Sequence, residues 1–558
     1  RINMKIIAES AFNHNGDVNY LLELAKEAKE TNTDYFTVQV MSVPEFCTKD
    51  YSKYLLYKEN TLDFKEWNLV FDFCKSIDLN VIPCVLDLYS LEYCYNYGMR
   101  FFKLHATDIT NIPMLEYLRT KEDVLLILET QCATSLEINF ALDKIGDDKV
   151  ECLIHGFSNY PTEVEDLNLN TLDYLRDYFP LCKVGLADHS LDVTAIPLMA
   201  LAKGCDYLEK HITLSRNNRN FDYQVSLYPY EFSQMVSAVR HYQKSLGQYM
   251  KHPVKSEMPY RTIMYKKYLG NNQFKRANEG QDYMSYMIDS FKKKDVGIAL
   301  IARLKSKRLK EKILQPLHDT FMLDFLYKKL HLSKKVKKIF LATSPLLEDR
   351  SLVDLTKKEG YNIHLGHPVS VLDRMLELCL NQKLGAIFRV TGDNPFTDIK
   401  LIDQMIDLML ENDLDYVRVN GVPFGVSGEL FSTKYLWKLY MNMENPMNSE
   451  YLTLFVLNDN DARKGCIDVE SSIKDMKYIN LSVDYQEDLD RVKKLLEKLG
   501  DKDPYAINMA DLVEYIDTLD REDKNKIIKL PNEKTILFSD FLAKLENQNY
   551  IIRKKNKI

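Results

Sequence analysis

VGLADHSLDVTAIPLMALAKGCDYLEKHIT, residues 184–213, is the stretch of sequence that decides the fold of the first half of the chain. It reads as an apolar strand, a helix and a second apolar strand. His189 closes the first strand and His211 closes the second. The strands of a parallel barrel end at one rim, where such barrels do their chemistry, so the two imidazoles are expected side by side. This spacing indicates a metal site, and the alternative is that each histidine only caps its strand.

A carboxylate accompanies each of these histidines. Asp188 directly precedes His189, and Glu209 lies two residues before His211. Carboxylates near a histidine ligand orient its ring and raise its basicity, which favours the metal interpretation. We therefore expect Asp188 and Glu209 to hold the two rings in place.

The same alternation of short apolar runs and amphipathic segments extends over residues 1–246. Eight runs are expected as strands: 5–10, 35–40, 80–85, 100–106, 124–129, 150–156, 183–189 and 205–212. Segments with apolar residues three and four apart lie between them, as helices require. Eight strands, each followed by a helix within this length, predict a (β/α)8 TIM barrel.

The second half of the chain is expected to be a separate domain. Residues 247–295 break the rhythm and are predicted to be a helical linker. Apolar runs then return at 296–302, 337–343, 361–366, 385–392, 414–419 and 478–483 with helical segments between them. This pattern predicts a doubly wound, Rossmann-like α/β domain over 296–515, whose ligands bind at the carboxyl ends of its strands. Residues 516–558 are expected to be a helical appendage.

Composition excludes several classes of protein. The 558 residues carry a net charge of −7, which argues against a general nucleic-acid binder. The ten cysteines form no CxxC pair and mostly lie in apolar runs, as in a reduced cytoplasmic protein. The sequence has no apolar stretch that predicts a signal peptide or a membrane span, so a cytoplasmic location is expected.

Polar residues follow most of the predicted barrel strands. They include Glu9, Asn13, His14, Gln39, Asp87, Lys103, Thr130, His155, Ser158 and Tyr160. Each one alone is as consistent with a capped or solvated loop, but polar residues at so many strand ends are typical of a barrel active site.

These motifs make the first 245 residues resemble the sialic acid synthase family, which condenses phosphoenolpyruvate with an N-acylated amino-sugar aldehyde. AESAFNHNG, FKLHA, HGFSNYPTE, GLADHS and EKHITL occur here in the order of the family motifs. The resemblance implies a divalent metal, Mn²⁺ or Mg²⁺, on His189 and His211, with Glu9 and Asp222 beside the aldehyde and water. The other residues that it implies at the substrates are Asn13, Gln39, Lys103, Thr130, Ser158, Tyr160 and Ser226. It also implies a homo-oligomer.

Two departures from the family bear on the binding of an anionic substrate. Thr37 stands where the family has a lysine, and Glu129 where it has a serine. Losing a cation and gaining a carboxylate are expected to weaken the binding of phosphoenolpyruvate. The family's C-terminal antifreeze-like domain also has no counterpart in the sequence.

In the second half, a basic loop follows the first predicted strand. Arg303, Ser306, Arg308 and Lys312 crowd this strand-to-helix loop, where doubly wound folds bind phosphates. The alternative is a solvated helix face. Asp393 and Asp484 each follow a predicted strand, and two such carboxylates suit the Mg²⁺ that accompanies a nucleoside triphosphate.

IARLKSKRLKEK, ATSPLLED, GHPVSVLDRM, RVTGDNP and VDYQEDL make residues 296–500 resemble the spore-coat polysaccharide cytidylyltransferases, relatives of the CMP-sialic acid and CMP-octulosonate synthetases. The resemblance implies CTP as substrate, Mg²⁺ on Asp393 and Asp484, phosphate contacts from Arg303, Ser306, Arg308 and Lys312, and a substrate contact from Arg389. Lys310 and Glu311 replace the family's Pro-Gly, which reduces backbone freedom near the phosphates.

Together the two resemblances predict a bifunctional enzyme. Its first half would make a 2-keto-3-deoxy sugar acid of the sialic acid type, and its second half would couple that acid to CMP. Two alternatives remain open: an octulosonate-type product, and a barrel that has lost catalysis and serves as a ligand-binding or scaffold domain.

Overall fold

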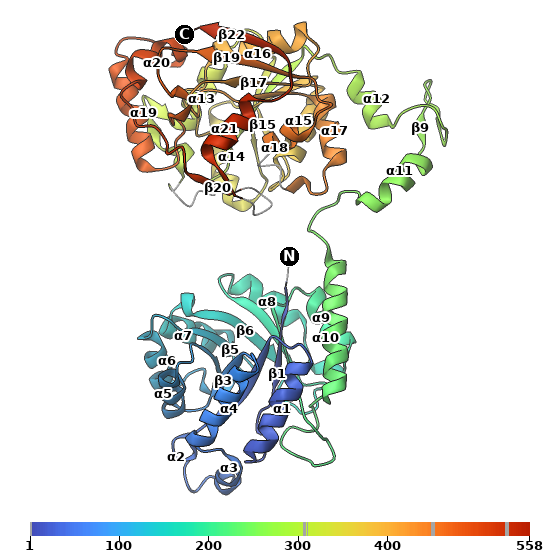
Figure 1. Ribbon diagram of the computed structural model, residues 1–558, viewed down its shortest axis with the longest axis vertical. Coiled ribbons are helices and arrows are strands. Elements are labelled where there is room, and N and C mark those ends of the chain that lie inside the picture. The colour runs from blue at the N-terminus through green and yellow to red at the C-terminus, as the bar shows by residue number, and fades with distance from the viewer. Residues whose placement is uncertain (1–2, 305–308, 310, 448–451, 530–534, 558) are drawn as a thin grey trace. The chain divides into compact units, whose positions relative to one another are not determined.

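The computed structural model describes residues 3–304, 309, 311–447, 452–529 and 535–557. The chain divides into two compact units, Arg1–Tyr249 and Met250–Ile558 (Figure 1). The division falls three residues beyond the predicted end of the barrel. Within the described ranges, no helix combines the length and the apolarity needed to cross a membrane.

The first unit is the predicted (β/α)8 barrel. Its eight parallel strands close in sequence order: β1 (Lys5–Glu9), β2 (Tyr35–Val40), β3 (Val81–Val85), β4 (Phe101–Leu104), β5 (Leu125–Glu129), β6 (Val150–Gly156), β7 (Lys183–Asp188) and β8 (Tyr207–His211). The helix after each strand is, in turn, α1 (Val18–Glu30), α4 (Phe64–Ser76), α5 (Leu88–Tyr97), α6 (Ile112–Arg119), α7 (Ser135–Ile145), α8 (Asn170–Tyr178), α9 (Ala195–Ala202) and α10 (Pro229–Gln243). Two short helices, α2 (Val43–Phe46) and α3 (Tyr54–Asn60), precede α4.

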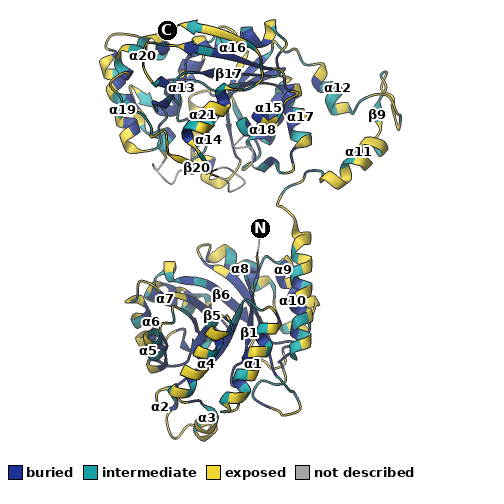
Figure 2. Ribbon diagram, in the orientation of Figure 1, coloured by how far each residue is buried: buried dark blue, intermediate teal, exposed yellow. Residues whose placement is uncertain are grey.

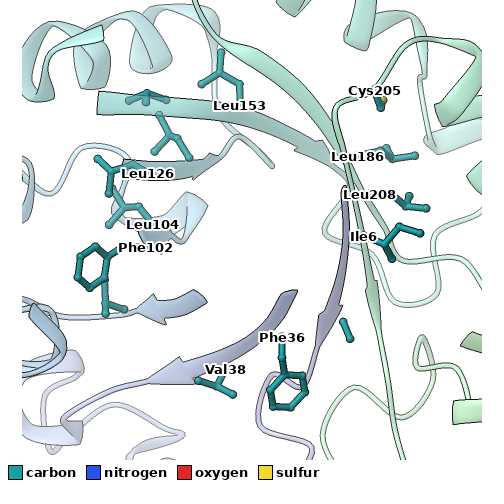
Figure 3. Close-up of a cluster of buried hydrophobic side chains, with 14 of the residues drawn as sticks. Ile6, Phe36, Val38, Phe102, Leu104, Leu126, Leu153, Leu186, Cys205 and Leu208 are labelled. Carbon is teal, nitrogen blue, oxygen red and sulfur yellow. The ribbon is translucent and has the colours of Figure 1, made fainter. Parts of the chain in front are cut away.

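The pleat of the strands sorts side chains between the two faces of the barrel wall. Outward residues such as Ile6, Phe102 and Leu208 pack with the helices in one large core (Figure 3). Inward residues such as Ile7 and Ile127 form a second, smaller cluster inside the barrel. The strands are accordingly the most deeply buried elements of the unit, whereas the helices keep exposed outer faces (Figure 2). Every second residue of a strand therefore points into the barrel, and the last inward position of each strand lies at its carboxyl rim.

The second unit contains an eight-stranded mixed sheet of order β15-β14-β11-β16-β18-β17-β19-β22. The strands are β11 (Val296–Ile301), β14 (Lys338–Thr343), β15 (Ile363–Leu365), β16 (Ala386–Thr391), β17 (Tyr416–Asn420), β18 (Glu429–Ser432), β19 (Lys464–Glu470) and β22 (Tyr550–Lys557). Only β18 pairs with its neighbours in antiparallel fashion.

Helices cover both faces of this sheet, as the doubly wound prediction requires. The sheet has a hydrophobic core on each face. Ile298 and Leu300 of β11 pack in one core and Ala299 packs in the other, so alternate residues of the strand point to opposite faces. The helices are α13 (Met322–Leu330), α14 (Arg350–Lys358), α15 (Val371–Gln382), α16 (Ile399–Glu411), α17 (Thr433–Asn442), α18 (Leu452–Asn458), α19 (Gln486–Lys498), α20 (Met509–Ile516) and α21 (Phe538–Glu546).

The predicted linker belongs to the second unit. It contains α11 (Met258–Met264), a hairpin of β9 (Lys267–Tyr268) and β10 (Phe274–Lys275), and α12 (Tyr283–Asp289). The indole N–H of Trp437 on α17 donates to the hydroxyl of Ser285 on α12 at 3.2 Å. The finer division of the chain into four segments stays a prediction.

Two predictions about this unit were wrong in detail. Residues 478–483 form no regular strand: two hydrogen bonds with Phe424 make a single bridge at Asn480. Their alternating apolar pattern arises because Ile479, Leu481 and Val483 are buried in extended chain beside the core. The expected helical appendage does contain α21, but it also carries the strand pairs β20 (Ile527–Lys529) with β21 (Thr535–Leu537), and β22, which joins the main sheet.

Candidate active sites

Lys103 is the centre of the polar cluster at the carboxyl rim of the barrel. Its ammonium lies 2.5 Å from Glu9 Oε2, 2.9 Å from Glu129 Oε1 and 2.9 Å from Glu209 Oε1, and all four side chains are buried. They occupy inward positions of β4, β1, β5 and β8, so the pleat directs them to one point. We call these four residues the Lys103 cluster.

Burial and mutual charge set the protonation of the Lys103 cluster. Burial raises the pKa of Glu209 to about 8, so this carboxyl holds its proton at neutral pH. Burial opposes ionisation of Glu129 as well, but the charge of Lys103 outweighs it and lowers the pKa of Glu129 to about 2. Burial lowers the pKa of Lys103, yet the neighbouring glutamates, Glu129 foremost, more than reverse this effect and keep the ammonium charged.

His189 and His211 lie beside each other, as predicted, with ring centroids 5.1 Å apart. Nδ1 of His189 lies 2.8 Å from the Phe157 carbonyl oxygen, so it carries the proton and Nε2 keeps a free lone pair. Nδ1 of His211 is buried without a hydrogen-bond partner in the described structure. Burial lowers the pKa of both rings, which favours the neutral form that binds metals.

The expectation that Asp188 and Glu209 orient these rings was wrong. Asp188 follows the inward residue Ala187, so the pleat turns it outward, where it accepts a hydrogen bond from Lys210 Nζ at 2.6 Å. Glu209 points inward but pairs with Lys103. The backbone carbonyl of Phe157, rather than a carboxylate, orients His189.

Asp222 and Tyr160 complete the mouth of the barrel. The ring of Tyr160 lies 4.6 Å from that of His189 and 6.2 Å from that of His211, centroid to centroid. Burial, together with the charge of Glu9, raises the pKa of Asp222 to about 6. Asp222 has a left-handed backbone with φ of 59°, which turns the chain at this rim.

The remaining predicted barrel residues differ in how fully the fold uses them. The Asn13 amide donates to the Phe221 carbonyl and accepts from the Tyr20 hydroxyl, both at 2.7 Å, so it ties loops together. The hydroxyls of Thr130 and Ser226 donate to the backbone carbonyls of Ile154 and Asp222. Within the described residues, the side chains of Gln39 and Ser158 make no hydrogen bond and remain available to a ligand.

In the second unit, Lys312 joins the two predicted aspartates. Its ammonium lies 2.6 Å from Asp393 Oδ2 and 2.8 Å from Asp484 Oδ1. We call these three residues the Lys312 cluster. Burial lowers the pKa of Lys312, but the charges and hydrogen bonds of both aspartates raise it further. All three side chains stay partly exposed, at 16% for Lys312, 19% for Asp393 and 29% for Asp484.

Two predicted arginines of this unit, Arg303 and Arg389, are already engaged. Arg303 donates to Asp349 Oδ2 at 2.9 Å, to the Pro368 carbonyl at 2.6 Å, and to Glu348. Arg389 donates to Glu429. Ser306 and Arg308 lie outside the described residues. Arg303 therefore fixes the loop after β11 to the acidic turn Leu347–Asp349, a partner that was visible in the sequence as the ED of ATSPLLED.

Two protein-family models match this sequence, one in each unit. The NeuB family model matches residues 25–251, and the cytidylyltransferase family model matches residues 298–517. The chain belongs to both families. Both are families of enzymes, and each match covers one of the two units.

Individual relatives agree with this division. The chain is 32% identical to an uncharacterized protein of Methanocaldococcus jannaschii, over 55% of this chain and 91% of that protein. It is 28% identical to the N,N'-diacetyllegionaminic acid synthase of Legionella pneumophila, over 46% of this chain and 78% of the relative. It is also 29% identical to the spore coat polysaccharide biosynthesis protein SpsF of Bacillus subtilis, over 37% and 89%.

Sequence reasoning missed one part of the cytidylyltransferase unit. A cavity of about 280 Å³ lies at the carboxyl ends of β16 and β17, lined by Arg389, Thr391, Asn394, Arg418, Glu429, Thr453, Lys477, Leu542 and Glu546 among others. Leu542 and Glu546 belong to α21, beyond the family match. Arg418 was a detectable signal, because a charge inside the apolar run LDYVRV has to be buried or to serve a ligand.

Proposed function

We propose that this chain makes a 2-keto-3-deoxy sugar acid in its NeuB barrel and activates such an acid with CTP in its cytidylyltransferase unit. The proposal rests on one observation: two enzyme families of successive reactions share one chain, each with a charged cluster at the carboxyl ends of its strands. Phosphoenolpyruvate, a sugar aldehyde and CTP are the proposed substrates.

In the first reaction, C3 of phosphoenolpyruvate forms a bond to the aldehyde carbon, water adds at C2, and inorganic phosphate leaves. Asp222, with a pKa near 6, is suited to exchange a proton with the reacting oxygen or water at neutral pH. Lys103 would orient the carboxylate of the enol substrate. Gln39, Ser158 and Tyr160 would complete the contacts, while Asn13, Thr130 and Ser226 hold the loops that carry them.

The donor set of the barrel fits a divalent metal, either Mn²⁺ or Mg²⁺. Nε2 of His189 and the buried, unpartnered Nδ1 of His211 are neutral imidazole nitrogens on neighbouring rings. The described residues contain no group of three or more His, Cys, Asp or Glu side chains arranged for a metal, so water and substrate would supply the other ligands. A bound metal would act as a Lewis acid toward the aldehyde oxygen.

In the second reaction, the anomeric hydroxyl of the acid attacks the α-phosphorus of CTP, pyrophosphate leaves and the hydroxyl proton passes to solvent. The Lys312 cluster fits Mg²⁺, since a cation already lies between the two aspartates. When bound there, Mg²⁺ would neutralise charge on the triphosphate. Lys312, freed from the aspartates, would then move toward the phosphates, with Arg303, Ser306 and Arg308 around them.

The test is a product screen with the full chain. Phosphoenolpyruvate, Mn²⁺, Mg²⁺, CTP and a panel of N-acylated amino sugars are incubated, and products are identified by mass spectrometry. We expect release of both phosphate and pyrophosphate and a CMP-linked acid. Replacing CTP with UTP should reduce transfer by about 10⁴-fold, because a site that pairs with a base edge rejects exchanged donors and acceptors. Equal turnover with UTP or with a sugar 1-phosphate would instead indicate that the second unit is a sugar-nucleotide transferase of broader type.

A second candidate function concerns the barrel alone. Lys103 is matched by three glutamates, and Thr37 provides no cation, so the cluster offers little free positive charge to a trianionic substrate. This observation favours a barrel that binds a ligand without condensation. Phosphate release from phosphoenolpyruvate separates the two candidates. An octulosonate-type acid in place of the sialic acid type is a variant that the same screen distinguishes.

The location of the protein follows from the proposed chemistry, whereas its assembly is proposed from the family resemblance. Phosphoenolpyruvate and CTP are metabolites of the cytoplasm, and the ten cysteines are free thiols. We propose a cytoplasmic enzyme that forms a homo-oligomer, which light scattering of the purified chain tests directly.

A further inference from the structure

Arg418 is a charged side chain that the protein itself leaves without a partner. It lies on β17, and its Nε and Nη1 are buried with no hydrogen-bond acceptor. Within the described residues it forms no ion pair and no hydrogen bond, although the charge of Glu429 acts on it. A buried guanidinium normally has a carboxylate or several carbonyls around it, because an unpaired buried charge is strongly unfavourable.

The cavity holds two guanidinium groups but one carboxylate between them: Glu429 is ion-paired with Arg389 and acts on Arg418 only through its charge. Arg389 pairs with Glu429, which also accepts hydrogen bonds from Tyr416 at 2.5 Å and Thr453 at 2.7 Å. Lys477 pairs with Glu546 of α21, at 2.7 and 2.8 Å. Among the described lining residues, the net charge of the cavity is therefore that of a single guanidinium, which one carboxylate would neutralise.

The cavity adjoins the Lys312 cluster. Thr391 lines the cavity and donates to Asp393 Oδ1 at 2.6 Å, and the Asn394 amide donates to Thr391 at 2.9 Å. Asn394 Oδ1 is buried without a donor, so the cavity also presents an acceptor for a hydroxyl. Phe541, Leu542 and Leu545 of α21 supply apolar lining.

We propose that this cavity is the binding site for the acceptor acid, and that Arg418 binds its carboxylate. The inference rests on the proposed cytidylyl transfer and names the residue that makes the unit select an acid over a neutral sugar. The planar guanidinium matches a carboxylate with two parallel hydrogen bonds, and the ion pair gains strength from burial. Residues beyond the family match thus supply part of the substrate site.

Thermal unfolding without CTP tests binding apart from catalysis. The ligands are N-acetylneuraminate, 3-deoxy-octulosonate and the methyl ester of N-acetylneuraminate, each at millimolar concentration. The melting temperature of the wild type should rise with at least one free acid and not with the ester. Arg418→Leu should melt at or above the wild-type temperature without ligand, because it removes a guanidinium without hydrogen bonds and leaves Glu429 paired with Arg389, and it should show no rise with acid. Arg463→Leu, at the amino end of the neighbouring strand β19, is the matched control and should respond as the wild type does.

Steady-state kinetics give the second measurement. Arg418→Leu should raise the KM for the acid about 10–100-fold while the KM for CTP stays within a factor of two. An unchanged KM for the acid, or an equal shift with acid and ester, overturns the assignment. A raised KM for CTP instead would place a phosphate at Arg418 and also overturn it. If the wild type binds the acid through Arg418 but transfers no cytidylyl group, the proposed function fails while this inference stands.

Discussion

The two units each hold a lysine between carboxylates, but Lys103 and Lys312 lie in opposite environments. Lys103 and its three glutamates are at most 5% exposed, so they act on one another inside the barrel, away from solvent. Lys312 and its two aspartates remain partly open to solvent. In a buried cluster each charged group depends on its neighbours, whereas the ammonium of an exposed cluster can be displaced by an incoming cation. Substituting one residue of the Lys103 cluster should therefore be strongly destabilising, while the Lys312 cluster can accept the cation that accompanies its substrate.

The largest expected effect is at the open cluster. Asp393→Asn should reduce cytidylyl transfer by at least about 10²–10³-fold, because one of the two carboxylates that would hold Mg²⁺ is lost. Release of phosphate from phosphoenolpyruvate should remain unchanged, since separate domains with their own cores rarely share catalytic groups. Pyrophosphate and phosphate assays on one preparation measure both. Asp461→Asn, an exposed aspartate of the same unit, is the control. Loss of both activities in a folded variant would show that the units are coupled.

At the closed cluster, Lys103→Met should destabilise the barrel by about 3–5 kcal/mol, because the carboxylates lose their buried counter-charge. Urea unfolding measures it in a Trp437→Phe background, where Trp67, buried in the barrel core, is the only remaining tryptophan. Lys183→Met removes an exposed pair with Glu151 and should change the unfolding free energy by no more than about 1 kcal/mol. Similar losses in both variants would mean that the Lys103 cluster is not closed to solvent.

His211→Ala should lower the metal content of the barrel and its phosphate release by at least about 10-fold. Substituting a residue that only hydrogen-bonds to a metal ligand already has an effect of that order. Mass spectrometry of bound metals and a phosphate assay give the two readings. His241→Ala, an exposed histidine on α10, provides the comparison and should leave both unchanged. Full metal occupancy without His211 would assign this histidine to packing.

The smallest effect is on the pH dependence of stability. Folded Glu209 has a pKa of about 8, above its ordinary value of 4.5, so its contribution is complete below the ordinary value and is lost as pH rises through about 8. The unfolding free energy of the barrel should fall between pH 5 and 8, by up to about 1 kcal/mol per pH unit. Glu209→Gln should flatten this slope. Parallel slopes for the two proteins would assign the proton to another member of the cluster.

The sequence predicted the elements of the barrel more completely than the contacts of its site. Strand positions followed from apolar runs, and the strand-end histidines were predicted to meet. The orientation of Asp188 was misjudged because the pleat of a strand directs consecutive side chains to opposite faces. Applying the period of two to residues 187–189 would have separated Asp188 from His189. The three partners of Lys103 could not be predicted, since the register between β1, β4, β5 and β8 is a property of barrel closure.

In the second unit, the sequence singled out all three members of the Lys312 cluster but not their pairing, and Asp484 follows a bridge rather than a strand. The cavity beside the cluster was not predicted from the sequence. Its lining combines β16, β17 and β18 with α21, a helix more than a hundred residues from Arg418 along the chain. No local pattern connects segments so far apart, and β18 is too short for periodicity to reveal it.

The pairing of β19 with β22 has a consequence for synthesis on the ribosome. The barrel has all its strands and helices once α10 has emerged, whereas the last strand of the second sheet begins at Tyr550. At about 5–20 residues per second, roughly 15–60 s separate the two events. For the last part of that interval, the roughly 4–16 s between completion of β19 at Glu470 and synthesis of Tyr550, β19 is an unprotected sheet edge, which is prone to pair with other chains. The nascent second unit is therefore the part of this protein that most needs a chaperone.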